Sequence, residues 1–371
     1  MFFKDSFNRL SFVSTLISLI FSLISGDILH AGVSLENTSK REDVEKARRV
    51  IVTPKELDRM SKLPGDIGPL PKITAPSDNP QIKAKIELGK MLFFDKRLSG
   101  DNSISCASCH DPRKGFSDGK ERAIGFGGME LGRHTPTILN AAYNSLQFWD
   151  GRAPSLEKQA LGPIEAKVEM NLRGDELVSR LKKIPEYNKR FQEVFGEDVN
   201  FTNVGKAIAA FERTIVTPDS PFDRYAGGDK KALNEQEKRG LILFLGKAAC
   251  SQCHSGPNFS DNSFYALGVN QKGPLKEDFG RYAVTKKDED KGAFKTPTLR
   301  NIALIAPYMH DGAFKTLEEV IDFYNDGGGS VFNKSEKIVK LNLTAEEKKD
   351  LIAFLNALTG KLPEVTEPQL P

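Results

Sequence analysis

Two short runs combine a pair of thiols with an adjacent imidazole, and these side chains can carry redox or metal chemistry. They are Cys106-Ala107-Ser108-Cys109-His110 and Cys250-Ser251-Gln252-Cys253-His254. Both have the pattern C-x-x-C-H, which is the attachment site of a c-type haem. Two thiols at this spacing can form thioether bonds to the two haem vinyl groups, and the following histidine then reaches the iron as its proximal ligand. The sequence therefore predicts two covalently bound haems, with His110 and His254 as iron ligands.

The cysteine count supports this interpretation over its alternatives. All four cysteines lie in the two motifs, so none is left for a disulfide or a free thiol. A C-x-x-C pair alone also occurs as a redox dithiol or as half of a zinc site. Neither use requires a histidine directly after the second cysteine, and this histidine is present twice.

The first 34 residues have the features of a secretory signal peptide. Lys4 and Arg9 supply positive charge, and the mostly apolar stretch Leu10–Ile24 is about as long as a signal h-region and short for a membrane span. Small residues follow, so we expect cleavage near Ala31, with residues 1–34 as the signal peptide. An uncleaved N-terminal anchor is the alternative. Since c-type haem is attached after export, the signal and the motifs agree on an extracytoplasmic protein, most simply a periplasmic one.

Length and composition limit the remaining possibilities. The 371 residues are enough for two domains of ordinary size, and the 39% of hydrophobic residues can supply their cores. The formal net charge is only +3 and no basic stripe occurs, so the sequence does not indicate nucleic-acid binding. Residues 35–80 are polar and contain prolines, and we interpret them as a mobile leader segment ahead of the folded part.

The two halves of the chain repeat each other, which bears on how the motifs are positioned. Residues 135–140 (TPTILN) match residues 296–301 (TPTLRN), and without any gap Trp149-Asp150-Gly151 falls on His310-Asp311-Gly312. Each half therefore contains one C-x-x-C-H motif and one copy of the same following pattern. We infer one haem-binding unit per half.

Helical patterns accompany both motifs, and no strong strand alternation is visible. Ile82, Ile86 and Phe93 lie on one helical face ahead of the first motif. Asn234 with Glu237 is a capping-box pattern that predicts the start of a helix before the second motif.

A similar pattern, Thr344 with Glu347, predicts a further helix that keeps Leu358 inward and ends at Gly360. The predicted fold is all-α, with two cytochrome-c-like haem domains related by internal duplication. We place the N-terminal domain at residues 81–222 and the C-terminal domain at residues 223–371, because prolines and glycines cluster between them.

At this level of detail the sequence resembles the bacterial di-haem cytochrome c peroxidases, a family that includes MauG-type maturases. The resemblance covers roughly residues 80–360 and rests on both haem motifs, on residues 147–152 (QFWDGR), and on residues 296–301 together with residues 307–312 (PYMHDG). It implies a peroxide-reacting haem in the N-terminal domain and an electron-transfer haem in the C-terminal domain. It also implies a calcium ion between the domains in many members.

The resemblance assigns roles to three residues of the N-terminal half. Trp149 matches the family's tryptophan between the haems, which relays electrons. Gln159 and Glu169 lie ten and twenty residues after it, as the family's distal-pocket glutamine and glutamate do. Their counterparts in the second half are Val320 and Ser330, so only the first haem keeps the polar pair. A carboxylate beside the iron can take a proton from peroxide and return it to the leaving oxygen.

The sixth ligand of the first haem is expected to be absent. Peroxidases of the usual kind in this family carry a displaceable histidine in the loop after the first motif, but residues 111–133 contain none. This resembles the MauG-type members, in which the peroxide-reacting haem stays open. His134 stands where many relatives have a calcium-binding asparagine, so we expect it to order the loop, and the calcium site is in doubt.

The sixth ligand of the second haem has two candidates. Tyr324 falls where the usual peroxidases have an axial methionine and where MauG-type members have a tyrosine. Met309 is the alternative, because methionine is the common partner of histidine in cytochromes c. The repeat places Met309 opposite the apolar Phe148, and we therefore favour Tyr324.

The resulting expectation is an oxidoreductase: a periplasmic di-haem peroxidase that reduces hydrogen peroxide at the N-terminal haem with electrons passed through the C-terminal haem. Its electron donor would be a small cytochrome c or cupredoxin. One alternative is a MauG-type oxidase that modifies a partner protein, and another is a di-haem electron carrier without catalysis. A homodimer is left open.

Overall fold

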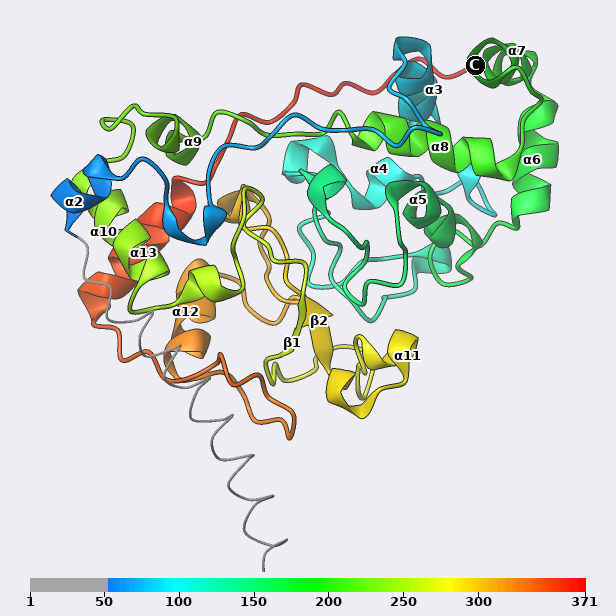
Figure 1. Ribbon diagram of the computed structural model, residues 1–371. Helices are drawn as coiled ribbons and strands as arrows, with labels where there is room; N and C mark the ends of the chain where they lie inside the picture. The colour runs from blue at the N-terminus through cyan, green and yellow to red at the C-terminus, as the bar shows by residue number, and fades with distance from the viewer. Residues whose placement is uncertain (1–52) are drawn as a thin grey trace, which may run out of the picture. The chain divides into compact units, whose positions relative to one another are not determined.

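The computed structural model describes residues 53–371, and this part of the chain is mostly helical with little sheet (Figure 1). The predicted signal peptide at residues 1–34 lies outside the described residues. None of the helices in residues 53–371 is long and apolar enough to cross a bilayer. The helices and strands are α2 (Pro54–Arg59), α3 (Lys83–Phe94), α4 (Cys106–Cys109), α5 (Leu156–Glu165), α6 (Gly174–Lys182), α7 (Pro185–Phe195), α8 (Phe201–Glu212), α9 (Pro221–Ala226), α10 (Glu235–Leu245), β1 (Phe264–Ala266), α11 (Tyr282–Thr285), β2 (Ala293–Lys295), α12 (Leu317–Asn325) and α13 (Ala345–Asn356).

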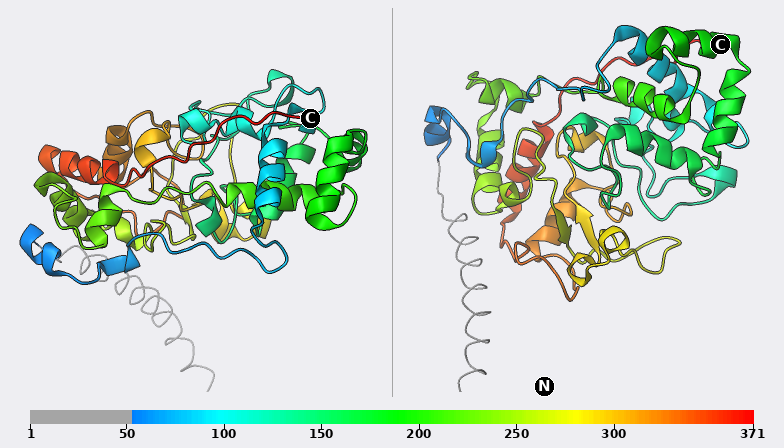
Figure 2. Two further views of the ribbon diagram at one scale, coloured as in Figure 1. Left: turned by 90° about the horizontal axis from the view of Figure 1, so that it is seen from above. Right: turned by 45° about the vertical axis from the view of Figure 1, so that its right-hand side comes forward.

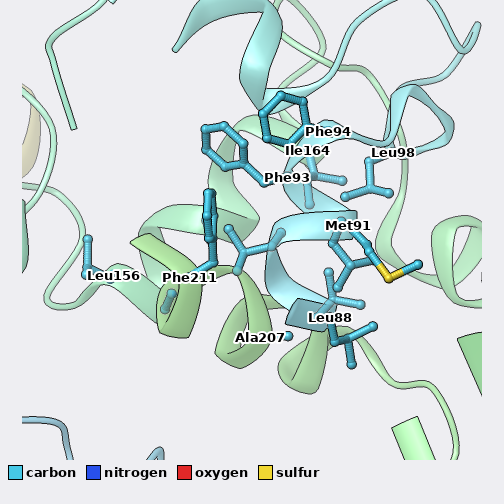
Figure 3. Packing of buried hydrophobic residues seen from close by; sticks show 14 of the residues in the cluster. Leu88, Met91, Phe93, Phe94, Leu98, Leu156, Ile164, Ala207 and Phe211 are labelled. Carbon is cyan, nitrogen blue, oxygen red and sulfur yellow. The ribbon is translucent and has the colours of Figure 1, made fainter. Parts of the chain in front are cut away.

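A first hydrophobic cluster is built by α3 and α5–α8, with α3 crossing α8. Gly89 permits this close crossing, because a Cβ atom at this position would collide with the carbonyl oxygen of Ala207. Phe93 of α3 meets Phe211 of α8 with the ring centroids 5.2 Å apart (Figure 3). These helices pack behind the first haem motif, since Cys106 contacts the same cluster.

A second hydrophobic cluster is built by α2, α9, α10, α12 and α13. The crossing of α10 and α13 again depends on a glycine, because a Cβ atom on Gly240 would collide with the carbonyl oxygen of Asp350. Cys250 of the second haem motif packs against this cluster. Figures 1 and 2 show the two groups of helices at opposite ends of the described part of the chain.

The predicted helix starts are confirmed where capping chemistry indicated them. Asn234 caps α10 and Thr344 caps α13, each with the complete capping box. α13 ends at Asn356, although Leu358 beyond it is fully buried, so the predicted end at Gly360 is four residues too late. The predicted apolar face of α3 is wrong at Ile82, which precedes the helix and is 45% exposed.

Both ends of the described chain run from one cluster to the other (Figure 1). Leu57, Leu63 and Ile67 are buried in the second cluster, so the prediction of a mobile leader at residues 35–80 is wrong for the part from residue 53 onward. Residues 35–52 lie outside the described residues. The burial of these three residues could not be predicted from the sequence, because three apolar residues in a polar segment show no helical periodicity. The C-terminal tail runs back to the first cluster, where Leu370 packs (Figure 1).

One small sheet departs from the all-α prediction. β1 and β2 pair in antiparallel fashion, with Phe264 opposite Lys295 and Ala266 opposite Ala293. Strands of three residues are too short to produce a recognisable alternation of apolar and polar positions. The sheet places Lys295 beside the segment that carries Trp149, because the Lys295 N–H donates to the Trp149 carbonyl oxygen (2.8 Å).

Candidate functional site

A continuous cavity of about 1050 Å³ runs between the two helix groups and reaches both C-x-x-C-H motifs. Small-molecule sites usually measure about 300–1,000 Å³, so this space is large for a single ligand. Apolar side chains such as Ile138, Leu156, Phe244 and Ile302 form much of its wall. All six side chains predicted to attach haem line it: Cys106, Cys109, His110, Cys250, Cys253 and His254.

Both motif histidines are oriented as iron ligands should be. Nδ1 of His110 lies 3.2 Å from the carbonyl oxygen of Phe116, and Nδ1 of His254 lies 3.0 Å from that of Phe259. A carbonyl oxygen can only accept, so the proton sits on Nδ1 in each ring and Nε2 is left with its lone pair. Metal-binding histidines usually have this second contact, which fixes the ring and its tautomer.

The local fold explains how each motif presents its histidine. The first motif forms the short helix α4, and the His110 N–H donates to the Cys106 carbonyl oxygen (2.8 Å). The second motif forms a 3-10 turn, and the His254 N–H donates to the Cys250 carbonyl oxygen (2.9 Å). In both turns the cysteines and the histidine face the same cavity.

The thiols fit haem attachment better than the redox alternative. All four cysteines are free of disulfides. Burial raises the pKa of Cys109 and of Cys253 to about 11, whereas reactive C-x-x-C thiols have a lowered pKa. Neutral thiols beside an apolar cavity, with a histidine whose Nε2 is available, fit the needs of a c-type haem at each motif.

The segments that follow the motifs are tied down in the same way in both halves. The Ser117 hydroxyl donates to the Thr135 carbonyl oxygen (2.8 Å), and the Ser260 hydroxyl donates to the Thr296 carbonyl oxygen (2.7 Å). These bonds hold the repeated TPT segments against the loops that accept from the two histidines. The proximal wall of each haem site is therefore fixed by a buried hydroxyl.

Trp149 lies where the two halves of the chain meet. Its indole Nε1–H donates to the carbonyl oxygen of His134 (3.0 Å). The His134 N–H donates to the His310 carbonyl oxygen (2.7 Å), and the Lys295 N–H donates to the Trp149 carbonyl oxygen (2.8 Å). The indole is thus held in a fixed orientation on the wall of the shared cavity.

Gln159 and Glu169 are brought to the same cavity as His110. Gln159 projects from α5, and its amide has no hydrogen-bond partner among residues 53–371, so it can bond to a ligand. Glu169 lies in the loop that follows α5, and its backbone carbonyl oxygen accepts a hydrogen bond from the Phe126 N–H (2.8 Å). Burial raises the pKa of the Glu169 carboxyl, and the positive charges of Arg152 and Arg133 partly oppose this shift.

Arg152 was not predicted as a site residue, although it ends the motif of residues 147–152. Its guanidinium stacks on the ring of Phe148, 3.5 Å from the ring centroid, and bonds to Asp150 (3.0 Å). A second nitrogen lies 4.0 Å from the Glu169 carboxylate. Arg152 is therefore positioned to orient Glu169.

His134 is buried, and its Nδ1 lies 2.7 Å from the carbonyl oxygen of Lys120. This contact ties His134 to the loop that follows the first motif, which supports a role in ordering that loop. The loop folds back on itself, with the Leu131 N–H donating to the Ala123 carbonyl oxygen (2.8 Å).

Both candidates for the sixth ligand of the second haem line the cavity. Tyr324 lies in α12, and burial is the main cause that raises the pKa of its hydroxyl. Its hydroxyl has no hydrogen-bond partner in the described part of the chain. Met309 has a positive φ of 71° in the turn before His310.

Two buried titratable groups of the cavity wall could not be identified from the sequence. Glu212 at the end of α8 is 3% exposed, and its Oε2 has no hydrogen-bond partner within residues 53–371. Burial raises the pKa of Glu212 to about 8. Lys295 at the end of β2 is 7% exposed. Neither belongs to a motif with an expected role, and their burial follows only from the fold.

The calcium ion implied by the resemblance stays a prediction. No group of three or more His, Cys, Asp or Glu side chains within residues 53–371 is arranged to hold a metal ion.

Comparison with known proteins agrees with this geometry. A family model described as di-haem cytochrome c peroxidase matches residues 83–231. The chain is 44% identical over 336 residues to the cytochrome-c peroxidase IdrP1 of Pseudomonas sp. (strain SCT), a match that covers 82% of this chain and 89% of the relative. It is 44% identical over 298 residues to the methylamine utilization protein MauG of Methylorubrum extorquens, covering 80% and 84%.

A solved structure is also similar along most of the chain. It is described as a MauG-like protein associated with microbial copper homeostasis, with a TM-score of 0.72, 35% identity, and coverage of 79% of this chain and 94% of that one. On the strength of the relatives and the family model, the chain belongs to the di-haem cytochrome c peroxidase family of oxidoreductases.

Proposed function

We propose that this protein is a periplasmic di-haem peroxidase that reduces hydrogen peroxide at its N-terminal haem with electrons passed through its C-terminal haem. The asymmetry of the cavity supports this function. Gln159 and Glu169 accompany His110, whereas Val320 and Ser330 take their places in the second half. The two haems supply the redox chemistry, which converts hydrogen peroxide, two electrons and two protons into two waters.

The protein's part in the reaction is to move protons and to exclude competing ligands. A carboxylate oxygen of Glu169 takes the proton of the incoming peroxide and returns it to the leaving oxygen. Arg152, 4.0 Å away, keeps this carboxylate directed into the cavity. The free amide of Gln159 donates a hydrogen bond to the peroxide. Residues 111–133 contain no histidine that could compete with peroxide for a haem held by His110.

Trp149 provides the contact between the two haem sites. Its indole is anchored on His134, and its carbonyl oxygen accepts from Lys295 in the second half. An aromatic ring held rigidly between two redox centres shortens the distance that electrons must cross. We therefore assign Trp149 the role of electron relay.

The repeated geometry supports an origin by internal duplication. His134 and Lys295 occupy equivalent positions in the repeat, as do Trp149 and His310. The N–H of His134 donates to His310, and the N–H of Lys295 donates to Trp149, so the two halves exchange equivalent bonds. This is how two copies related by a twofold axis contact each other. We assign residues 81–222 and 223–371 to the two haem domains, with residues 35–80 as a leader segment.

A second candidate function is that of a MauG-type oxidase, which withdraws electrons from a partner protein and modifies it. Two observations favour it: residues 111–133 contain no displaceable histidine, and Tyr324 rather than a methionine projects from α12 into the cavity. MauG of Methylorubrum extorquens is among the relatives of this chain. A third possibility, an electron carrier without catalysis, does not account for Gln159 and Glu169.

The purified protein should contain two haems per chain in a pyridine haemochrome assay and should consume peroxide when supplied with a reduced cytochrome c or cupredoxin. Two haems without peroxide consumption by any donor, together with no reaction of the oxidised protein, would identify an electron carrier. Haem that acid acetone extracts would contradict covalent attachment and the proposal with it. Peroxide consumption that requires a protein substrate in place of a redox donor would favour the MauG-type alternative.

A further inference from the structure

Lys295 is a buried cation without a counter-ion among residues 53–371. It ends β2, is 7% exposed, and lines the haem cavity. In the described part of the chain its Nζ has one polar contact, a long one of 3.4 Å to the carbonyl oxygen of the next residue, Thr296. No carboxylate within residues 53–371 forms an ion pair with it.

The other buried lysines of the described chain are compensated. Lys238 pairs with Asp58 at 2.9 Å, and Lys85 donates to the side chain of Asn79 at 2.9 Å and to the carbonyl oxygen of Pro80 at 3.0 Å. Asp261 is the carboxylate whose charge acts on the pKa of Lys295. It already accepts a hydrogen bond from the hydroxyl of Tyr265 (2.7 Å). Lys295 therefore differs from them in facing an open apolar space.

An isolated charge in such an environment is costly, and proteins normally pair it. Burial lowers the pKa of Lys295 to about 8, which reflects the missing partner. An anion placed in the cavity would stabilise the charged form and offset the desolvation. The cofactor expected in this cavity carries two carboxylates of its own, the haem propionates.

We propose that Lys295 binds a propionate carboxylate of the haem attached at Cys250 and Cys253. This inference rests on the proposed function only in requiring that haem be bound at the second motif. The position favours this haem because Lys295 is close enough to His254 for its charge to act on the imidazole. In addition, the adjoining Thr296 accepts from Ser260, in the loop after the second motif.

The ion pair has a consequence for electron transfer. The backbone N–H of Lys295 donates to the carbonyl oxygen of Trp149, so one residue holds both the propionate edge of the second haem and the proposed relay. Neutralising a propionate close to the iron also removes a negative charge that would stabilise the ferric state. Lys295 thereby raises the reduction potential of the second haem.

The test is a spectroelectrochemical titration of both haems in the complete protein and in Lys295→Met. The variant should keep two haems per chain, and the reduction equilibrium constant of the second haem should fall at least tenfold, which is about 59 mV for a one-electron couple. In Lys295→Arg, which keeps the charge, the potential of the second haem should fall by less than half as much as in Lys295→Met. Lys334→Met is the matched control and should change neither potential, because Lys334 donates to Gly327 outside the cavity wall.

An unchanged potential of the second haem in Lys295→Met, or a shift confined to the first haem, would overturn the inference while leaving the two-haem proposal intact. Fewer than two haems in the wild-type protein would instead refute the proposed function. If Lys295→Met does not accumulate, the resonance Raman propionate bending mode of the wild-type second haem decides. A shift of this mode in D₂O supports a hydrogen-bonded ammonium, and no shift contradicts it.

Discussion

Replacing Glu169 by glutamine should slow the reaction of the oxidised protein with hydrogen peroxide by roughly 100- to 10,000-fold, the usual contribution of a positioned proton-transfer group. Glutamine keeps the size of the side chain but cannot take up the peroxide proton. Both haems should remain attached, because Glu169 contacts neither motif through a hydrogen bond. The measurement is the bimolecular rate constant from rapid mixing, followed in the Soret band.

The pH dependence of this rate gives a second signature of Glu169. The carboxylate must be ionised to accept a proton, so the wild-type rate should fall as the pH falls through the pKa of Glu169. Burial raises this pKa, and the fall should therefore lie at higher pH than for an ordinary glutamate, near 4.3. Glu169→Gln should lack this titration.

Trp149→Phe is the matched control, since Trp149 lines the same cavity. Its initial reaction with peroxide should proceed at the wild-type rate, whereas the later spectral change of the second haem should be delayed. If Glu169→Gln reacts as fast as the wild-type protein, Glu169 is not the acid/base group.

Replacing Tyr324 by phenylalanine should abolish the low-spin spectrum characteristic of the second haem. An anionic tyrosinate stabilises ferric iron, so its loss should also raise the reduction potential of this haem, by about 59 mV or more if the equilibrium constant changes tenfold. Met309→Leu should leave both the spectrum and the potential unchanged. Electronic absorption and low-temperature electron paramagnetic resonance of the two variants provide the comparison.

The opposite pattern would reassign the ligand. A near-infrared methionine-to-iron band that is lost in Met309→Leu and kept in Tyr324→Phe would make Met309 the sixth ligand. Methionine, a neutral ligand, raises the potential, and this outcome would move the protein toward a conventional peroxidase with a high-potential donor. Tyrosinate ligation instead suits an enzyme that stores oxidising equivalents on both haems.

Much of the candidate site could be predicted from the sequence because its residues occur in short contiguous motifs. A C-x-x-C-H motif contains the thiols and the proximal histidine of one haem within a single turn, so its geometry depends little on the rest of the fold. The predicted starts of α10 and α13 were found for the same reason, since a capping box lies within four residues. Gln159 and Glu169 required the family resemblance, because a glutamine and a glutamate ten residues apart form no pattern by themselves.

The features that the sequence did not reveal depend on contacts between distant segments. Lys295 and Glu212 are ordinary charged residues in the sequence, and only the fold encloses them in an apolar cavity. Likewise, Leu57 lies in a polar segment of the sequence, and only the structure shows that it packs in the second cluster. Burial is a property of the tertiary structure, so groups whose function depends on desolvation are the hardest to predict.

We propose that peroxide reacts at an open N-terminal haem served by Glu169 and Gln159. The most direct test of this proposal is rapid mixing of the fully oxidised wild-type protein with one equivalent of hydrogen peroxide, recorded across the Soret band. We expect a spectral change within milliseconds that needs no prior reduction of either haem. No change until one haem has been reduced, or no change at all, would contradict it.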